Sequence, residues 1–180
     1  MKQLIPLLLF LTFAFTACTH EPAPAEAVKT ENQKAVLENC LNFKFDKAIA
    51  FVTINPYVYE RGGTNKIEDL KDSISIQLND EQLKLLNDVL AGKYKNDSND
   101  NSGADCFNPR HHVFFLKNDG TVLQYISVCF ECNNKEFSIA NKADIANLEM
   151  FFNLIQLPSF IDFYKHLNYY KPKIKSRAKN

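Results

Sequence analysis

The residues best suited to chemistry lie close together in one segment, CFNPRHHVFFLKNDGTVLQYISVCFEC, which spans residues 106–132. A cysteine, an arginine and two histidines stand at its beginning, and a Cys-x-x-Cys pair stands at its end. Thiols and imidazoles in this combination can form disulfides, bind zinc or carry out redox chemistry. The candidate site residues are Cys106, Arg110, His111, His112, Cys129 and Cys132.

A β-hairpin is expected to bring the two ends of this segment together. Asp119-Gly120 lies between two runs of β-forming residues and is typical of a two-residue type I′ turn. The resulting register pairs Leu116 with Leu123, Phe114 with Tyr125, His112 with Ser127 and Arg110 with Cys129. Continued further, it places Cys106 opposite Asn133, beside Cys132, although a proline should end the regular pairing before that point. We therefore expect all six candidate residues to be neighbours at one end of the hairpin.

The N-terminal sequence MKQLIPLLLFLTFAFTAC bears on the compartment in which this chemistry takes place. A basic Lys2, an apolar run and a small pair of residues precede Cys18, which is the pattern of a signal peptide. The stretch resembles the lipobox of bacterial lipoproteins. The resemblance implies that Cys18 is lipidated and that its acyl chains anchor the protein to the membrane. Thr19 stands where lipoproteins retained in the inner membrane typically carry Asp, which implies the outer membrane.

Composition predicts one folded domain behind this anchor. Residues 1–17 are expected to be the signal peptide and residues 18–34 the lipidated cysteine with a flexible tether rich in Pro, Ala and Glu. Residues 35–170 suffice for a single core, and residues 171–180 form a basic C-terminal tail. The formal net charge is zero, or about −1 once Lys2 is removed with the signal peptide, which argues against a nucleic-acid partner.

Disulfides are the favoured chemistry for the cysteines. With Cys18 acylated, four cysteines remain in an oxidising compartment, enough for two bridges in three possible pairings. A bridge from Cys106 to Cys129 or to Cys132 would tie the preceding loop to the hairpin end. Cys40 could then pair with the cysteine left over. Such a bridge is expected to stabilise the fold by about 3 kcal/mol.

Structural zinc is the second possibility, and thiol redox chemistry the third. Cys106-x4-His111 and Cys129-x2-Cys132, seventeen residues apart, are similar to the two arms of a Cys3His zinc site. Four protein ligands would leave no position for water, so such a site would not be catalytic. His111 and His112 should face opposite sides of the sheet. We take His111 as the ligand, although the register alone places His112 with Cys129.

The same residues resemble a pattern found in small Gram-negative bacterial lipoproteins whose activity is uncharacterised. In that pattern a C-x-x-P-R-H segment precedes two strands that end in C-F-x-C, as Cys106 to His111 and Cys129 to Cys132 do here. The resemblance implies that Cys106, His111, Cys129 and Cys132 belong to one site. It leaves Cys40 outside the pattern, and it implies no activity.

Periodicity predicts the elements that must position these residues. Strands are expected at residues 45–54, 72–78 and 137–140, in addition to the hairpin. Asn79 and Asn141 are expected to cap two helices, and a third helix should follow Pro158. In this third helix the side chains expected to face the core are Phe160, Phe163, Tyr164 and Leu167. The predicted fold is α+β, with an antiparallel sheet of four to five strands, a central β-hairpin and helices on one side.

Two classes of function are compatible with these features. The first is a membrane-anchored binding or structural module whose cysteine cluster pins the hairpin end. The second is a thiol-redox enzyme or metal carrier, facing the periplasm, that uses the Cys-x-x-Cys. No carboxylate pair, nucleophile elbow or phosphate-binding glycine loop accompanies the cluster, so we favour the non-catalytic module.

Overall fold

The computed structural model describes residues 39–59, 72–94 and 106–177 of the chain. The expected signal peptide, the lipidated Cys18 and the tether lie outside these residues. Among the helices that the three ranges contain, none has the length and apolar character needed to span a bilayer.

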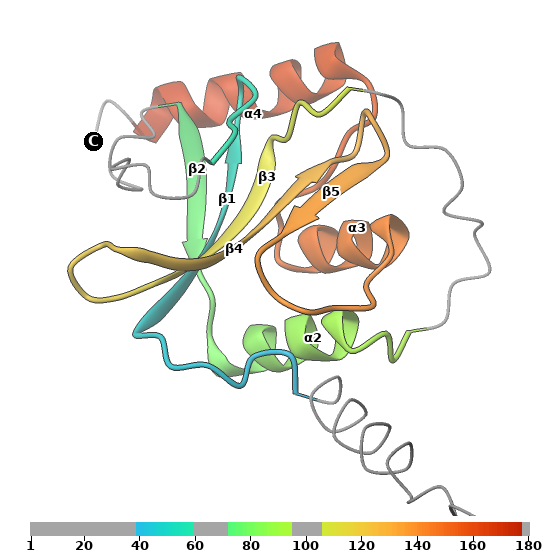
Figure 1. The fold of residues 1–180 in the computed structure, drawn as a ribbon. Coiled ribbons are helices and arrows are strands. Elements are labelled where there is room, and N and C mark those ends of the chain that lie inside the picture. Colours follow the sequence, from blue (N-terminus) through green and yellow to red (C-terminus); the bar gives the residue numbers. More distant parts are fainter. Residues whose placement is uncertain (1–38, 60–71, 95–105, 178–180) are drawn as a thin grey trace, which may run out of the picture.

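A five-stranded antiparallel sheet forms the centre of the domain, with strand order β2-β1-β3-β4-β5 (Figure 1). The strands are β1 (Lys47–Thr53), β2 (Ser73–Gln77), β3 (His111–Leu116), β4 (Val122–Cys129) and β5 (Asn134–Phe137). The predicted α+β fold with a central hairpin is confirmed. Because β1 inserts next to β3, the hairpin strand β3 lies in the middle of the sheet with a neighbour on each side.

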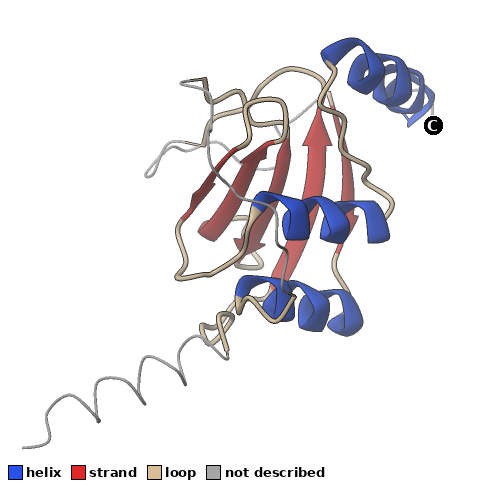
Figure 2. Cartoon of the chain, turned by 90° about the vertical axis from the view of Figure 1, so that its right-hand side faces the viewer, coloured by secondary structure: helices blue, strands red, loops and turns tan. Residues whose placement is uncertain are grey.

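Within the described ranges, three helices pack on this sheet. They are α2 (Asp80–Leu90), α3 (Ile145–Leu154) and α4 (Phe163–Arg177). Helices α2 and α3 cover one face, whereas α4 runs across one end of the sheet (Figures 1 and 2). Asn79 caps α2 as predicted, because its side chain accepts the N–H of Gln82 at 2.9 Å and the Gln82 side chain accepts the N–H of Asn79 at 3.0 Å.

Both faces of the central strands are buried, which explains why β3 lacks the alternation of a half-exposed strand. On the helix side, Val113 and Phe115 of β3 join the main core with Phe152 of α3. On the other side, Phe114 and Tyr125 belong to a smaller aromatic cluster, packed against by tyrosines that follow β1. A histidine in β3 must therefore be buried whichever face it occupies.

The hairpin turn differs from the prediction. The N–H of Lys117 bonds to the carbonyl of Thr121 at 2.9 Å, and the N–H of Gly120 bonds to the carbonyl of Lys117 at 3.0 Å. Gly120 has φ of 88°, whereas Asp119 is not at positive φ. The loop thus has three residues and not two, as in a type I turn followed by a left-handed residue. Leu116 consequently faces Val122 and not Leu123.

A register shift between Phe115 and Leu116 then restores the predicted pairing farther from the turn. Phe114 faces Tyr125 and His112 faces Ser127, as predicted. The paired register ends at His111 with Val128, so the predicted pairing of the residues one step beyond is not part of the ladder.

The helices after the hairpin begin later than predicted. Asp144, and not Asn141, caps α3, because Asn141 uses its side chain to donate to a nearby backbone carbonyl. Helix α4 begins at Phe163, five residues after Pro158. It ends at Arg177, so part of the expected basic tail is helical.

The buried stripe of α4 also differs from the prediction. The side chains of His166, Tyr170 and Ile174 face the core, at a spacing of four residues, whereas Tyr164 is 72% exposed. The contacts of His166 and Tyr170 with the backbone carbonyls of Thr53 and Pro158 turn this face of α4 toward the core.

Candidate functional site

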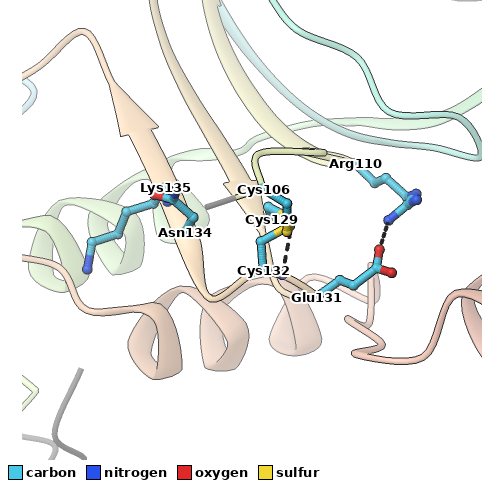
Figure 3. Close-up of a disulfide and its surroundings, with 7 residues drawn as sticks. All are labelled: Cys106, Arg110, Cys129, Glu131, Cys132, Asn134 and Lys135. Carbon is cyan, nitrogen blue, oxygen red and sulfur yellow. Dashed lines mark hydrogen bonds and ion pairs between the residues drawn. A yellow bond between two sulfur atoms is a disulfide. The ribbon is translucent and has the colours of Figure 1, made fainter. Parts of the chain in front are cut away.

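A disulfide joins Cys106, just before β3, to Cys132, in the turn between β4 and β5 (Figure 3). The two Cα atoms are 5.8 Å apart, which is the usual separation for a bridge. The turn is tight: the N–H of Asn133 points to the carbonyl of Phe130 at 3.4 Å, and Asn133 has φ of 49°. The expected meeting of the two ends of the segment is confirmed, with Cys132 as the bridging partner.

The other two cysteines within the described residues, Cys40 and Cys129, are buried thiols in different places. Cys129 is the last residue of β4, and its sulfur accepts the N–H of Cys132 at 3.2 Å. Cys40 lies in the main core, where burial raises the pKa of its thiol and the ammonium of Lys142 partly opposes that shift. The second bridge that we expected between Cys40 and the leftover cysteine is not formed.

Arg110 links the hairpin end to two other elements. Its guanidinium contacts the Glu131 carboxylate at 2.6 Å and lies 4.8 Å from the centre of the Phe163 ring. The Arg110 side chain is only 13% exposed, whereas that of Glu131 is 39% exposed. The arginine therefore fastens the β4–β5 turn and the beginning of α4 to the start of β3.

His111 points to the helix side of the sheet. Its ring lies edge-on to the rings of Phe130 and Phe152, at centroid distances of 4.9 and 5.0 Å. Nε2 is 3.3 Å from the carbonyl oxygen of Pro158. A carbonyl only accepts, so Nε2 carries the proton. Burial lowers the pKa of His111 well below its ordinary value, and nearby His166 lowers it further, so the ring is neutral at pH 7.

His112 points to the opposite side, as the register predicted. It stacks on Phe51 at 4.7 Å, and its Nδ1 lies 3.0 Å from the hydroxyl of Ser127. Burial lowers the pKa of His112 to about 3. This histidine belongs to the small aromatic cluster, so it is a neutral core residue.

The sequence did not identify His166 as part of the site. Its Nε2 donates to the carbonyl of Thr53 at 2.8 Å, and its ring is 5.7 Å from that of His111 and 4.8 Å from that of Tyr170. Burial lowers the pKa of His166 as well. The available signal was its spacing of four from Tyr170, which would place it on a core-facing stripe.

These residues enclose a small pocket at the hairpin end, with room inside for about one water molecule. Its polar and sulfur-bearing walls are Asn108, Arg110, His111, Cys129, Glu131 and His166. Such a volume is too small to enclose an organic molecule. The arrangement can hold a water molecule beside the Cys129 thiol and the two imidazole rings.

The predicted Cys3His zinc arrangement is not the one adopted. Cys106 and Cys132 are bonded to each other, and His111 directs Nε2 at a carbonyl. Within the residues that the structure describes, no three or more histidine, cysteine or acidic side chains are grouped so that they could hold a metal ion. Of the three expected chemistries, the structure contains the disulfide, between Cys106 and Cys132.

Comparison of the chain with known protein families, with characterised proteins and with solved structures gave no match.

Proposed function

We propose that the protein is a lipid-anchored module of the cell envelope with a non-catalytic binding or structural role, built around a disulfide-pinned hairpin end. The observation that carries the proposal is the bridge between Cys106 and Cys132. Disulfides form and persist in oxidising compartments, so the bridge agrees with export directed by residues 1–17. The anchor would be the acylated Cys18, in the outer membrane, with the following residues as tether.

The polar groups of the pocket support a structural role because the Nε2 groups of both histidines and Nη1 of Arg110 bond within the protein, although Nε of Arg110 is buried without a partner. The carbonyl oxygen of Pro158 accepts from His111 Nε2 and also from the hydroxyl of Tyr170, at 3.3 and 2.8 Å. The N–H of His166 is likewise directed at a carbonyl, and Arg110 is engaged by Glu131. The buried rings of His111 and His166 each use Nε2–H in a bond to a backbone carbonyl, and these bonds connect the sheet to α4 and to the segment before it. They leave little for a substrate to bind.

Anchoring is tested by following the full-length protein in a Gram-negative host. We expect it to sediment with the outer membrane and to incorporate labelled fatty acid. The Cys18→Ser variant should lose the label and the membrane attachment, whereas Cys40→Ser, the matched control, should keep both. An unlabelled wild-type protein, or a Cys18→Ser variant that stays in the membrane with its signal peptide removed, would contradict the anchor.

The pinning role is tested by stability and not by activity. Reduction of the bridge should lower the free energy of unfolding without changing the secondary structure of the folded state. A domain equally stable with and without the bridge would show that the hairpin end does not depend on it.

A further inference from the structure

Three of the cysteines form one sulfur cluster. The N–H of Cys132 lies 3.2 Å from the sulfur of Cys129, so this sulfur lies beside the backbone of Cys132, and Figure 3 shows the side chains of the three cysteines together. The sulfur of Cys132 is in turn bonded to that of Cys106 (Figure 3). A thiol thus stands next to a disulfide inside the folded protein.

Burial differs sharply across this cluster. Cys129 and Cys132 are 2% and 1% exposed, whereas Cys106 belongs to the exposed residues. A bridge between the two buried cysteines would leave Cys106 as the thiol at the surface.

We propose that Cys129 exchanges with the bridge and thereby turns Cys106 into a reactive surface thiol. The Cys129 thiolate attacks the sulfur of Cys132, the bond between Cys132 and Cys106 breaks, and a bond between Cys129 and Cys132 forms. Cys106 leaves as a thiolate and takes up a proton, while Cys129 has given one up. The three cysteines of the cluster form one disulfide and one thiol before and after, so the step needs no oxidant or reductant.

The pocket supplies what the proton transfer requires. Cys129 lines it together with His111 and His166, and it has room for about one water molecule. Each histidine directs its Nε2–H at a backbone carbonyl, at 3.3 and 2.8 Å. A neutral ring bonded in this way keeps Nδ1 as its proton acceptor. A water held in this pocket can relay the proton that Cys129 releases.

The exchange goes beyond the proposed pinning role, although it starts from the same bridge. In the present state the bridge joins the start of β3 to the β4–β5 turn. In the exchanged state the turn would close on the end of β4 instead, and the segment before β3 would be released. The exposed Cys106 could then attack the disulfide of a partner molecule: a mixed disulfide forms with one partner sulfur, the partner's S–S bond breaks, and its other sulfur leaves as a thiolate.

Trypsin separates the two states of the cluster. Cleavage after Lys95 and Arg110 yields residues 96–110, which contain Cys106, and cleavage after Lys117 and Lys135 yields residues 118–135, which contain Cys129 and Cys132. The present state gives these two peptides linked to each other. The exchanged state gives a peptide 118–135 with an internal disulfide and a separate peptide 96–110.

The experiment treats folded, full-length protein with iodoacetamide in the absence of reductant, followed by acid quenching, digestion and mass spectrometry. We expect alkylated Cys106 to accumulate together with the internally bridged peptide, and faster at higher pH because the thiolate is the attacking form. Both Cys129→Ser and Cys129→Ala should abolish this labelling. Cys40→Ser should leave it unchanged.

Two results would overturn the exchange. One is that the cross-linked peptide keeps its abundance when the folded protein is treated with iodoacetamide, while an unfolded control sample is fully alkylated at its thiols. The other is labelling of Cys106 that continues in the Cys129 variants. If no cross-linked peptide is found before treatment, the bridge itself is absent, and the proposed function fails together with the exchange.

Discussion

Breaking the Cys106–Cys132 bridge should destabilise the domain by a predictable amount. The two residues are 26 positions apart, and the chain-entropy relation gives about 3.5 kcal/mol at room temperature for closing such a loop in the unfolded chain. Because a small domain is stable by only about 5 to 15 kcal/mol, this is a large share of the total. For a domain of this size it corresponds to a fall in Tm of roughly 10 to 15 °C.

The assay is urea unfolding followed by circular dichroism, with and without a thiol reductant. Cys106→Ser is the most informative variant, because Cys106 is exposed and a serine there buries no new hydroxyl. In reductant, wild type and Cys106→Ser should have the same free energy of unfolding. The reasoning is refuted if reduction, verified by alkylation of both cysteines, changes the wild-type value by less than about 1 kcal/mol.

Three further predictions concern other parts of the hairpin and its contacts. Because burial lowers the pKa of His112 from 6.5 to about 3, the unfolded chain takes up its proton first on acidification. The contribution of the neutral His112 ring to the free energy of unfolding is therefore complete above about pH 6.5. Below that pH it decreases by up to about 1.4 kcal/mol for each pH unit. Urea unfolding at several pH values should show this slope, and His112→Phe should reduce it; an unchanged slope would contradict the buried neutral ring. Arg110→Ala should cost about 1 to 2 kcal/mol, since it removes the packing and cation–π contact on Phe163, whereas Glu131→Gln, on the exposed side of the ion pair, should cost less than about 1 kcal/mol. Equal losses of unfolding free energy would show that the ion pair dominates. Gly120→Ala should cost about 1 kcal/mol, because φ at this position is 88° and the space around it is open; thermal unfolding that matches wild type would contradict a purely conformational cost.

The geometry of the hairpin end could be predicted from sequence because two errors cancelled: the loop is one residue longer than predicted, and the strands contain a register shift that was not predicted. The Asp-Gly pair located the reversal, but it did not reveal that only Gly120 takes a positive φ and that the loop has three residues. The irregularity at Leu116 absorbs the extra residue. His112 and Ser127 therefore face each other as predicted, and the cysteines beyond them meet. Hydrophobic alternation and turn residues are local signals, and this part of the fold follows from them.

The rest of the site depends on contacts that local signals do not contain. The choice of Cys132 over Cys129 as bridging partner is made by the turn after β4, in which Cys129 still belongs to the strand and pairs with Asn134. The start of α4 follows a segment held by bonds to the carbonyl of Pro158, one of them from a histidine 47 residues earlier. Such long-range contacts decide that His166 faces the pocket.

Peptide mapping of the cysteines in protein isolated from the cell envelope without reductant tests the central claim most directly. Acid quenching and alkylation before digestion keep the native pairing, and zinc is quantified in the same sample. We predict one cross-linked species that joins residues 96–110 to residues 118–135, with the remaining thiols alkylated only after unfolding. Four alkylatable cysteines together with one zinc per chain would contradict the claim, because the sulfurs would then bind a metal and not each other.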